Sequence, residues 1–224
     1  MAGDQKAIDV QLDPDLAPVS REMLHEQIYN QMKRNLMMGR FVPGQKLPLR
    51  GLAQSLGTSL MPVRDALQRL ESVGCVVSAA NRTMMVPEFS AKQLGDICTL
   101  RIILEGAAAE QAAVHRSEKE LEILLSYVEE IEKSTEQDDV DLFLEANYHF
   151  HMQVAEMSKI SFIKNILEPL WMHIGPSVRR TVPNQALFFI SARRHRDVYD
   201  AIVSRDGGAA AEAMRMDILE GTNF

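Results

Sequence analysis

The stretch LGTSLMPVRDALQRLESVGC, residues 56–75, decides the fold of the front of the chain. Gly57 ends one short helical segment and Gly74 ends the next, because glycine readily adopts the left-handed conformation that closes a helix. Thr58 or Ser59 can cap the segment between them. The stretch therefore predicts a tight turn that leads into a short helix.

Helical and β-prone patterns flank this stretch. Apolar residues recur at helical spacing over residues 20–38, and LRGLAQSLG predicts a second short helix over 49–57. After the quoted stretch, β-prone runs at 75–78 and 83–86 surround a short turn and predict a hairpin. Three helices with a tight turn between the second and third, followed by a hairpin, make a winged helix-turn-helix, whose third helix enters the major groove of DNA.

The rear of the chain shows helical patterns without a convincing strand. They cover residues 89–116, 118–133, 140–157, 160–173, 187–204 and 209–219, with breaks at 137–139, 175–176, 183–184 and 207–208. Short connections favour an antiparallel bundle. We therefore predict a mostly α protein: a flexible arm at 1–19, a winged helix-turn-helix DNA-binding domain at 20–87, and an all-helical ligand-sensing and dimerisation domain at 88–224.

Charge divides the chain in the same way. The whole protein has a formal net charge of −7. Residues 20–87 hold nine Lys/Arg against four Asp/Glu, a net charge of +5, whereas residues 88–224 hold 14 against 23, a net charge of −9. A basic front half favours a nucleic-acid partner. Chance asymmetry of charge is the alternative.

Cysteine content and hydropathy exclude several classes of protein. The two cysteines, Cys75 and Cys98, form no CxxC pair and no disulfide framework, which is typical of a reducing cytoplasm. The first 20 residues contain no apolar run, so we expect no signal peptide. No stretch reaches the roughly 18–20 apolar residues that a membrane span needs. We therefore expect a cytoplasmic protein without a membrane partner.

The segment PGQKLPLRGLAQSLGTSLMPVRDALQRLESVGCV, residues 43–76, resembles the DNA-binding signature of the GntR superfamily of bacterial transcription factors. The elements PG–L–LA–LG–S–PVR–AL–RLE–G match in order and without gaps. The helical remainder, with LRIILEGAAAEQAA at 100–113, is similar to the FCD ligand-sensing domain of the FadR-like branch. The resemblance implies a homodimer, a palindromic operator in double-stranded DNA, and a small acidic metabolite or a metal as effector.

The resemblance also implies which residues meet DNA. It places Arg50 and Arg64 against the duplex and Arg82 at the tip of the wing, although Thr83 stands where the family usually has glycine. Ser59 can contact a phosphate from the helix N-terminus, where backbone N–H groups also help. A solvated surface charge is the alternative interpretation of Arg64.

Leu60 and Met61 depart from the family pattern. Most relatives have an arginine at the position of Leu60, and leucine cannot make the bidentate contact to guanine that arginine makes. Either side chain can contact a thymine methyl group. We therefore expect an operator whose centre differs from the common family sequence. Otherwise affinity relies on phosphates and dimer symmetry, or DNA binding is weakened.

Four polar residues of the rear domain match the metal ligands of FCD domains. Asn147 and His151 are four residues apart and share one helix face. The resemblance adds His195 and Asp217 from two later helices, although the family usually has a carboxylate at the first of the four positions and histidine at the last. Two histidines and a carboxylate suit zinc, nickel, manganese or iron. The amide is a weak ligand, so a metal-free polar pocket is the alternative.

Arg101 and Glu105 resemble the Arg-x-x-x-Glu at the start of the family's sensing domain. Arginine can grip a carboxylate through two hydrogen bonds, so we expect Arg101 to face the cavity and bind a small organic acid. The alternative is a plain i,i+4 ion pair worth about 0.2–0.5 kcal/mol. His173 is a further candidate for lining the ligand pocket.

The sequence therefore predicts a cytoplasmic, dimeric DNA-binding regulator, acting as a repressor, and not an enzyme. One alternative is a metal-dependent enzyme of the helical domain, but no general base stands beside the expected metal site. The other is a sensor with weakened DNA binding, against which the arginines at positions 50, 64 and 82 argue.

Overall fold

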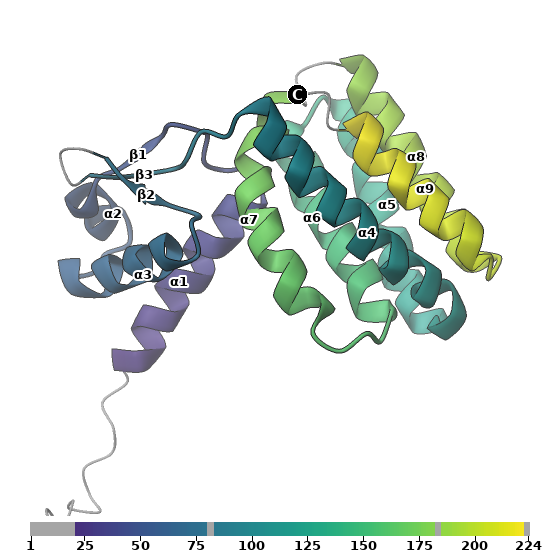
Figure 1. The fold of residues 1–224 in the computed structure, drawn as a ribbon, viewed down its shortest axis with the longest axis horizontal. Coiled ribbons are helices and arrows are strands. Elements are labelled where there is room, and N and C mark those ends of the chain that lie inside the picture. The colour runs from purple at the N-terminus through teal and green to yellow at the C-terminus, as the bar shows by residue number, and fades with distance from the viewer. Residues whose placement is uncertain (1–20, 80–82, 182–184, 222–224) are drawn as a thin grey trace, which may run out of the picture.

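The computed structural model describes residues 21–79, 83–181 and 185–221, and the fold is mostly helical, as predicted. Helices with a short sheet form one end of the molecule, and a bundle of longer helices forms the other (Figure 1). The predicted arm at 1–19 lies outside the described residues. In the described part of the chain, none of the helices combines the length and apolar character that a bilayer crossing requires.

The smaller end is the predicted winged helix-turn-helix. Its elements are α1 (Arg21–Met37), β1 (Lys46–Leu47), α2 (Leu49–Ser55), α3 (Leu60–Ser72), β2 (Val77–Ser78) and β3 (Met84–Met85). The hairpin β2–β3 is present, but β1 was not predicted. It pairs with β3 through Lys46 opposite Met85. A strand of two residues is too short to show the alternation of polar and apolar residues that marks a strand.

The core of this end lies between α1 and α3. Ile28, Met32 and Leu36 recur every four residues, so they share one face of α1, and each is at most 4% exposed. The two helices pack together, and Val63 and Leu67 are buried on α3. Burying one such side chain contributes about 1.5–3 kcal/mol, so this packing fixes how α3 is presented to solvent.

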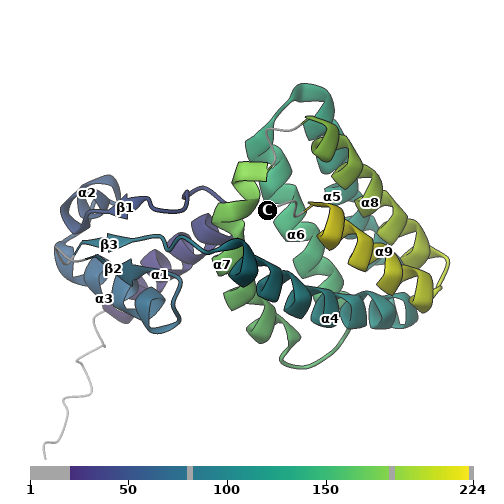
Figure 2. The ribbon, with the colours of Figure 1, turned by 45° about the horizontal axis from the view of Figure 1, so that its top comes forward.

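The larger end is the predicted helical bundle (Figure 2). It contains α4 (Ala91–His115), α5 (Glu118–Gln137), α6 (Val140–Met157), α7 (Ile163–Thr181), α8 (Gln185–Val203) and α9 (Gly207–Gly221). Local sequence starts several of these helices, because Ser90 and Ser117 each form a capping box and Asp139 accepts a hydrogen bond from the Leu142 amide. α9 packs along both α4 and α8.

The predicted break at Gly175-Pro176 is wrong, because α7 continues through both residues. A Cβ atom at Gly175 would lie 2.3 Å from the carbonyl oxygen of Leu36 and 2.6 Å from that of Met37. The glycine is therefore required by the close approach of α1, and not by a turn. Tertiary packing preserves a helix that Pro176 alone would interrupt.

The predicted break at Gly207-Gly208 is also wrong, because these glycines begin α9. The turn precedes them, with Arg205 in the left-handed conformation at φ 61°. Asp206 accepts a hydrogen bond from the Ala209 amide at 2.9 Å. An aspartate cap of this kind starts a helix even when glycines follow it.

α7 joins the two ends of the molecule. It packs against α1 as well as against α4 and α6. Lys33 of α1 forms an ion pair with Glu168 of α7 at 2.6 Å, and Arg179 donates a hydrogen bond to the Gly39 carbonyl. The helix that lines the bundle interior therefore also supports the winged helix-turn-helix. The predicted domain boundary at 87–88 stays a prediction.

Candidate DNA-binding groove and sensor site

A groove of about 880 Å³ opens between the start of α2, one face of α3 and the sheet. Leu60 and Arg64 are four residues apart on α3 and both line it, with Arg50 contributed by α2. The lining also includes Gln68, Thr83 and Met84. The turn between α2 and α3 thus places residues from two helices around one concave surface.

The arginines of this groove are available for a ligand. Arg50 and Arg64 are exposed, and neither forms an ion pair or a side-chain hydrogen bond with any described residue. Arg69 on the same helix differs. Its guanidinium lies 2.5 Å from a carboxylate oxygen of Glu26 and 3.8 Å from the centre of the Tyr29 ring. Arg69 therefore fastens α3 to α1, whereas Arg50 and Arg64 can meet phosphates.

The first turn of α3 presents three further predicted residues. Ser59 is the N-cap residue, yet its side chain forms no capping hydrogen bond, so its hydroxyl is free to donate to a phosphate. Leu60 is 39% exposed and Met61 is 56% exposed. Arg82 lies outside the described residues, so its place at the wing tip stays a prediction.

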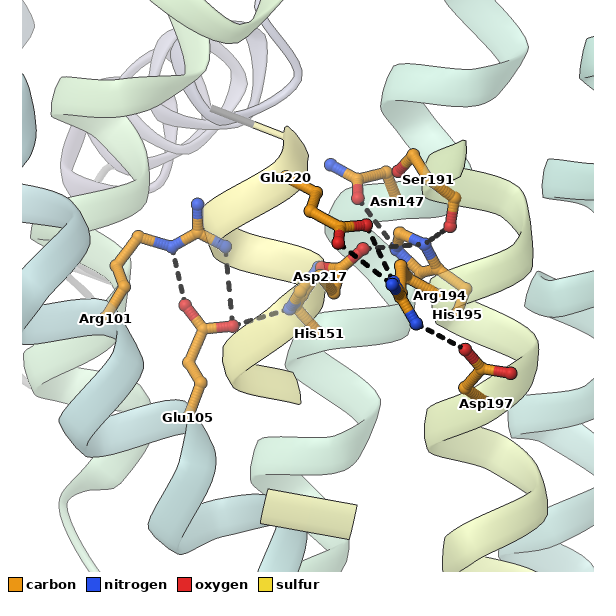
Figure 3. Close-up of polar contacts among 10 residues, drawn as sticks. All are labelled: Arg101, Glu105, Asn147, His151, Ser191, Arg194, His195, Asp197, Asp217 and Glu220. Carbon is orange, nitrogen blue, oxygen red and sulfur yellow. Dashed lines mark hydrogen bonds and ion pairs between the residues drawn. The ribbon is translucent and has the colours of Figure 1, made fainter. Parts of the chain in front are cut away.

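In the bundle, the four predicted metal-ligand residues come together (Figure 3). His151 lies on α6, His195 on α8 and Asp217 on α9, and one potential ligand atom from each lies within 4.8 Å of the others. All three are buried. The Asn147 amide oxygen is 2.9 Å from Nε2 of His195, and a carboxylate oxygen of Asp217 is 3.2 Å from Nε2 of His151. Cis ligands about 2.1 Å from one metal ion are separated by about 3 Å.

The hydrogen bonds of the two imidazoles also suit a metal. Nδ1 of His151 faces a carboxylate oxygen of Glu105 at 2.5 Å, and Nδ1 of His195 donates to the Ser191 carbonyl at 2.7 Å. Metal-binding histidines are commonly oriented by such an acceptor on the second ring nitrogen. Nδ1 of His195 is also 3.2 Å from Oδ1 of Asp217, but that oxygen accepts no hydrogen bond from any described residue. The donor set fits a divalent cation.

Arg101 and Glu105 continue this cluster towards α4. Nε of Arg101 donates to Glu105 at 2.6 Å, and the two side chains are 3% and 2% exposed. Burial raises the pKa of Glu105, but the charges of Arg101 and His151 outweigh it and lower that pKa to about 2. Burial lowers the pKa of His151, whereas Glu105 and Asp217 together raise it above its usual range. Arg101, Glu105 and His151 thus form a buried charged network. The energy of about 0.2–0.5 kcal/mol that applies to an exposed i,i+4 ion pair does not apply to it.

Trp171 also belongs to this cluster, although its role was not predicted from the sequence. The guanidinium of Arg101 lies 4.1 Å from its ring centre, and the His151 ring lies 5.0 Å from it. The buried indole N–H has no hydrogen-bond partner among the described residues. The available signal was that it is the only tryptophan of the chain, placed two residues before the predicted His173.

His173 lies apart from this cluster, at the joint between the two ends of the molecule. Its Nδ1 donates to the Pro169 carbonyl at 2.5 Å, its ring centre is 5.5 Å from that of Phe89, and both ring nitrogens are 3.9 Å from the sulfur of Cys75. This position gives no support to the prediction that His173 contacts an effector.

Comparisons with known proteins agree with both halves of the structure. Residues 24–86 match "Bacterial regulatory proteins, gntR family" and residues 96–219 match "FCD domain". The chain is 30% identical to the HTH-type transcriptional regulator McbR of Escherichia coli K12 over 165 residues, which cover 74% of this chain and 75% of that protein. It is 24% identical to the HTH-type transcriptional repressor RspR of the same strain over 217 residues, which cover 95% and 91%.

The same relationship holds in three dimensions. The solved structure of E. coli McbR/YncC has a TM-score of 0.82 and 26% sequence identity, over 88% of this chain and 93% of that one. Together with the winged helix-turn-helix and the buried polar site of the bundle, these matches establish the relationship. The chain belongs to the gntR family of bacterial regulatory proteins and carries an FCD domain, and it is a DNA-binding transcriptional regulator with a C-terminal effector-binding domain.

Proposed function

We propose that this regulator is a repressor whose affinity for its operator is controlled by a small organic acid, bound beside a divalent metal ion in the FCD domain. One observation carries the proposal. His151, His195 and Asp217 converge in the interior, and one oxygen of Asp217 accepts no hydrogen bond from the residues that the structure describes. The name of the relative RspR, a transcriptional repressor, supports the direction of regulation.

The metal would be held by Asn147, His151, His195 and Asp217. A buried carboxylate oxygen without a partner is costly, and a cation bound by it removes that cost. The mixed nitrogen and oxygen donors suit zinc, nickel, manganese or iron. When bound, the ion supplies positive charge and a coordination position that an effector oxygen can occupy.

Arg101 and Trp171 supply the other contacts to the effector. Nε and one terminal nitrogen of Arg101 face Glu105, and the other terminal nitrogen donates no hydrogen bond within the described ranges. The indole N–H of Trp171 is buried and also has no hydrogen-bond partner among the described residues. Two unused donors beside a metal site favour a ligand with several oxygen atoms, as in a hydroxy acid or a dicarboxylic acid.

A second copy of this chain would pack on the outer face of α4. Leu100, Ile103, Ala107 and Val114 are exposed there and follow heptad-like spacing along one stripe. Exposed apolar stripes of this kind mark interaction surfaces. A dimer would bind a palindromic operator with its two grooves.

The oligomeric state tests this surface. Ile103→Asp, which places a charge in the stripe, should yield monomers in sedimentation analysis, whereas Glu129→Gln on α5 should leave the oligomer unchanged.

The single tryptophan provides the test of the sensor site. Full-length protein is freed of metal with a chelator, and Trp171 emission is followed while zinc, nickel or manganese is added. We expect a saturable change at one metal per chain that His195→Ala abolishes. His149→Ala is the matched control, because His149 lies on α6 but stacks against Tyr127 outside the cluster.

The second step connects the site to DNA. Fluorescence anisotropy on the protein's own upstream DNA is measured with and without metal, across a panel of small hydroxy and dicarboxylic acids. We expect one class of acid to weaken DNA binding in the metal-loaded protein and to lose that effect in Arg101→Met. The proposed effector site would be contradicted if neither the Trp171 emission nor the affinity for DNA changed when metal or any of the acids was added.

A further inference from the structure

The start of α3 leaves two neighbouring apolar side chains partly exposed to solvent. Leu60 and Met61 are 39% and 56% exposed, whereas Val63 and Leu67 of the same helix are at most 1% exposed. The buried pair secures α3 to α1. The exposed pair contributes little to stability, so its apolar character calls for an explanation outside the fold.

Leu60 is the member of the pair that faces the groove. It lines the groove together with Arg64, one turn further along α3, and Arg50 from α2. Met61 follows about 100° around the helix axis. It shares a face with Asp65, which forms an ion pair with His25 of α1 at 3.1 Å. Met61 is therefore turned towards the flank of the groove.

The neighbours of Leu60 fix the class of surface that it meets. Arg50 and Arg64 are exposed cations without an ion pair to any described residue, and the Ser59 hydroxyl makes no capping hydrogen bond at the helix N-terminus. These groups suit DNA phosphates on either side of the helix. A helix held in this way inserts the side chains of its first turn towards the base edges of the major groove.

Leucine has no donor or acceptor for those edges. Guanine, cytosine and adenine present hydrogen-bond donors and acceptors in the major groove, and the one methyl group there is the C5-methyl group of thymine. We propose that Leu60 reads the operator by packing on a thymine methyl group, so that each half-site carries a T·A pair at this position. Burial of one methyl-sized group corresponds to about a fourfold change in affinity.

Replacing thymine with deoxyuridine tests this directly, because it removes the methyl group and keeps every hydrogen-bonding atom. The inference rests on sequence-specific DNA binding by the full-length protein, so the preferred duplex is first selected from a randomised pool. The two thymines that occupy equivalent positions in the half-sites are then replaced together by deoxyuridine, one position at a time. The dissociation constant is measured by fluorescence anisotropy at fixed salt. One position should weaken binding by about fourfold per half-site.

Variants of the protein then test whether Leu60 is the residue that contacts this methyl group. Leu60→Ala should weaken binding to the thymine operator by a similar factor. This variant should bind the thymine operator and the deoxyuridine operator with the same affinity. Met61→Ala, which changes the exposed neighbour that faces the flank of the groove, should keep the preference for thymine over deoxyuridine. Leu60→Arg should move the selected base towards guanine. Leu60 lies in the exposed first turn, and matching thermal unfolding curves will verify that the variants fold.

Two results would overturn the proposal: equal affinity for thymine and deoxyuridine at every position, or discrimination that survives unchanged in Leu60→Ala. If the selection returns no preferred duplex, the protein reads no base, and the inference fails together with the specific operator. In that case, no base change in the duplex alters the affinity. If only the leucine contact is wrong, the selection still returns a preferred duplex, and base changes in it still weaken binding.

Discussion

The DNA-binding groove and the sensor site both depend on arginine, but they treat its charge in opposite ways. Arg50 and Arg64 of the groove are exposed and unpaired among the described residues. Arg101 of the sensor is 3% exposed, paired with Glu105 and stacked on Trp171. Water solvates the groove cations, and we expect DNA phosphates to replace that water when the protein binds DNA. The interior has no such solvent, so each charge there needs a protein partner or a bound ion.

Breaking the interior network should produce the largest effect. Glu105→Ala leaves Arg101 buried without its carboxylate, which typically costs about 3–5 kcal/mol. Chemical denaturation of the metal-free protein measures this change. The control is Glu212→Ala, which breaks an exposed i,i+3 pair with Arg215 and should leave stability at the wild-type value. Equal stability of the two variants would contradict the contrast between interior and surface.

The joint between the two ends offers the next largest effect. Gly175→Ala places a methyl group less than 3 Å from two backbone oxygens of α1, which cannot move as a flexible side chain can. We expect a loss of about 1–3 kcal/mol. Gly95→Ala is the matched control, because no described residue outside the adjacent turns of α4 lies within 4 Å of its added methyl group. That variant should be more stable by about 0.5–1 kcal/mol.

Two arginines of the same helix should separate DNA binding from stability. Arg64→Ala should reduce the dependence of log K on log salt by about one phosphate contact and leave thermal unfolding unchanged. Arg69→Ala should lower the melting temperature, because it loses Glu26 and the Tyr29 ring, and should keep the salt slope. A reversal of the two outcomes would exchange the roles assigned to these residues. Anisotropy over a salt series and thermal unfolding measure both.

The serine caps should give the smallest effect. Ser90, the N-cap residue of α4, accepts a hydrogen bond from the Gln93 amide, so Ser90→Ala should cost about 1 kcal/mol. Ser59 makes no capping hydrogen bond, so Ser59→Ala should leave stability unchanged and only weaken DNA binding. Denaturation of the two variants side by side compares them. A similar loss in both would mean that Ser59 acts as an ordinary cap.

The sequence by itself determined the helices, the winged helix-turn-helix and the family. Periodicity and capping residues are local signals, as Ser117 and Asp139 show at the starts of α5 and α6. The segment over residues 43–76 carries the family resemblance in a single continuous motif. The choice of Asn147, His151, His195 and Asp217 depended on that resemblance, because their side chains are separated by up to 70 residues of chain.

Only the tertiary structure decided which helix faces meet. It places Arg101 in a buried network with His151 and Trp171. It also shows that Gly175 is a contact between α7 and α1 and not a helix break, and that His173 lies at the joint between the two ends of the molecule. Periodicity tells which face of a helix is buried, but it does not tell what that face packs against. The partner depends on non-local packing of whole helices, and the balance between burial and charge follows from that packing.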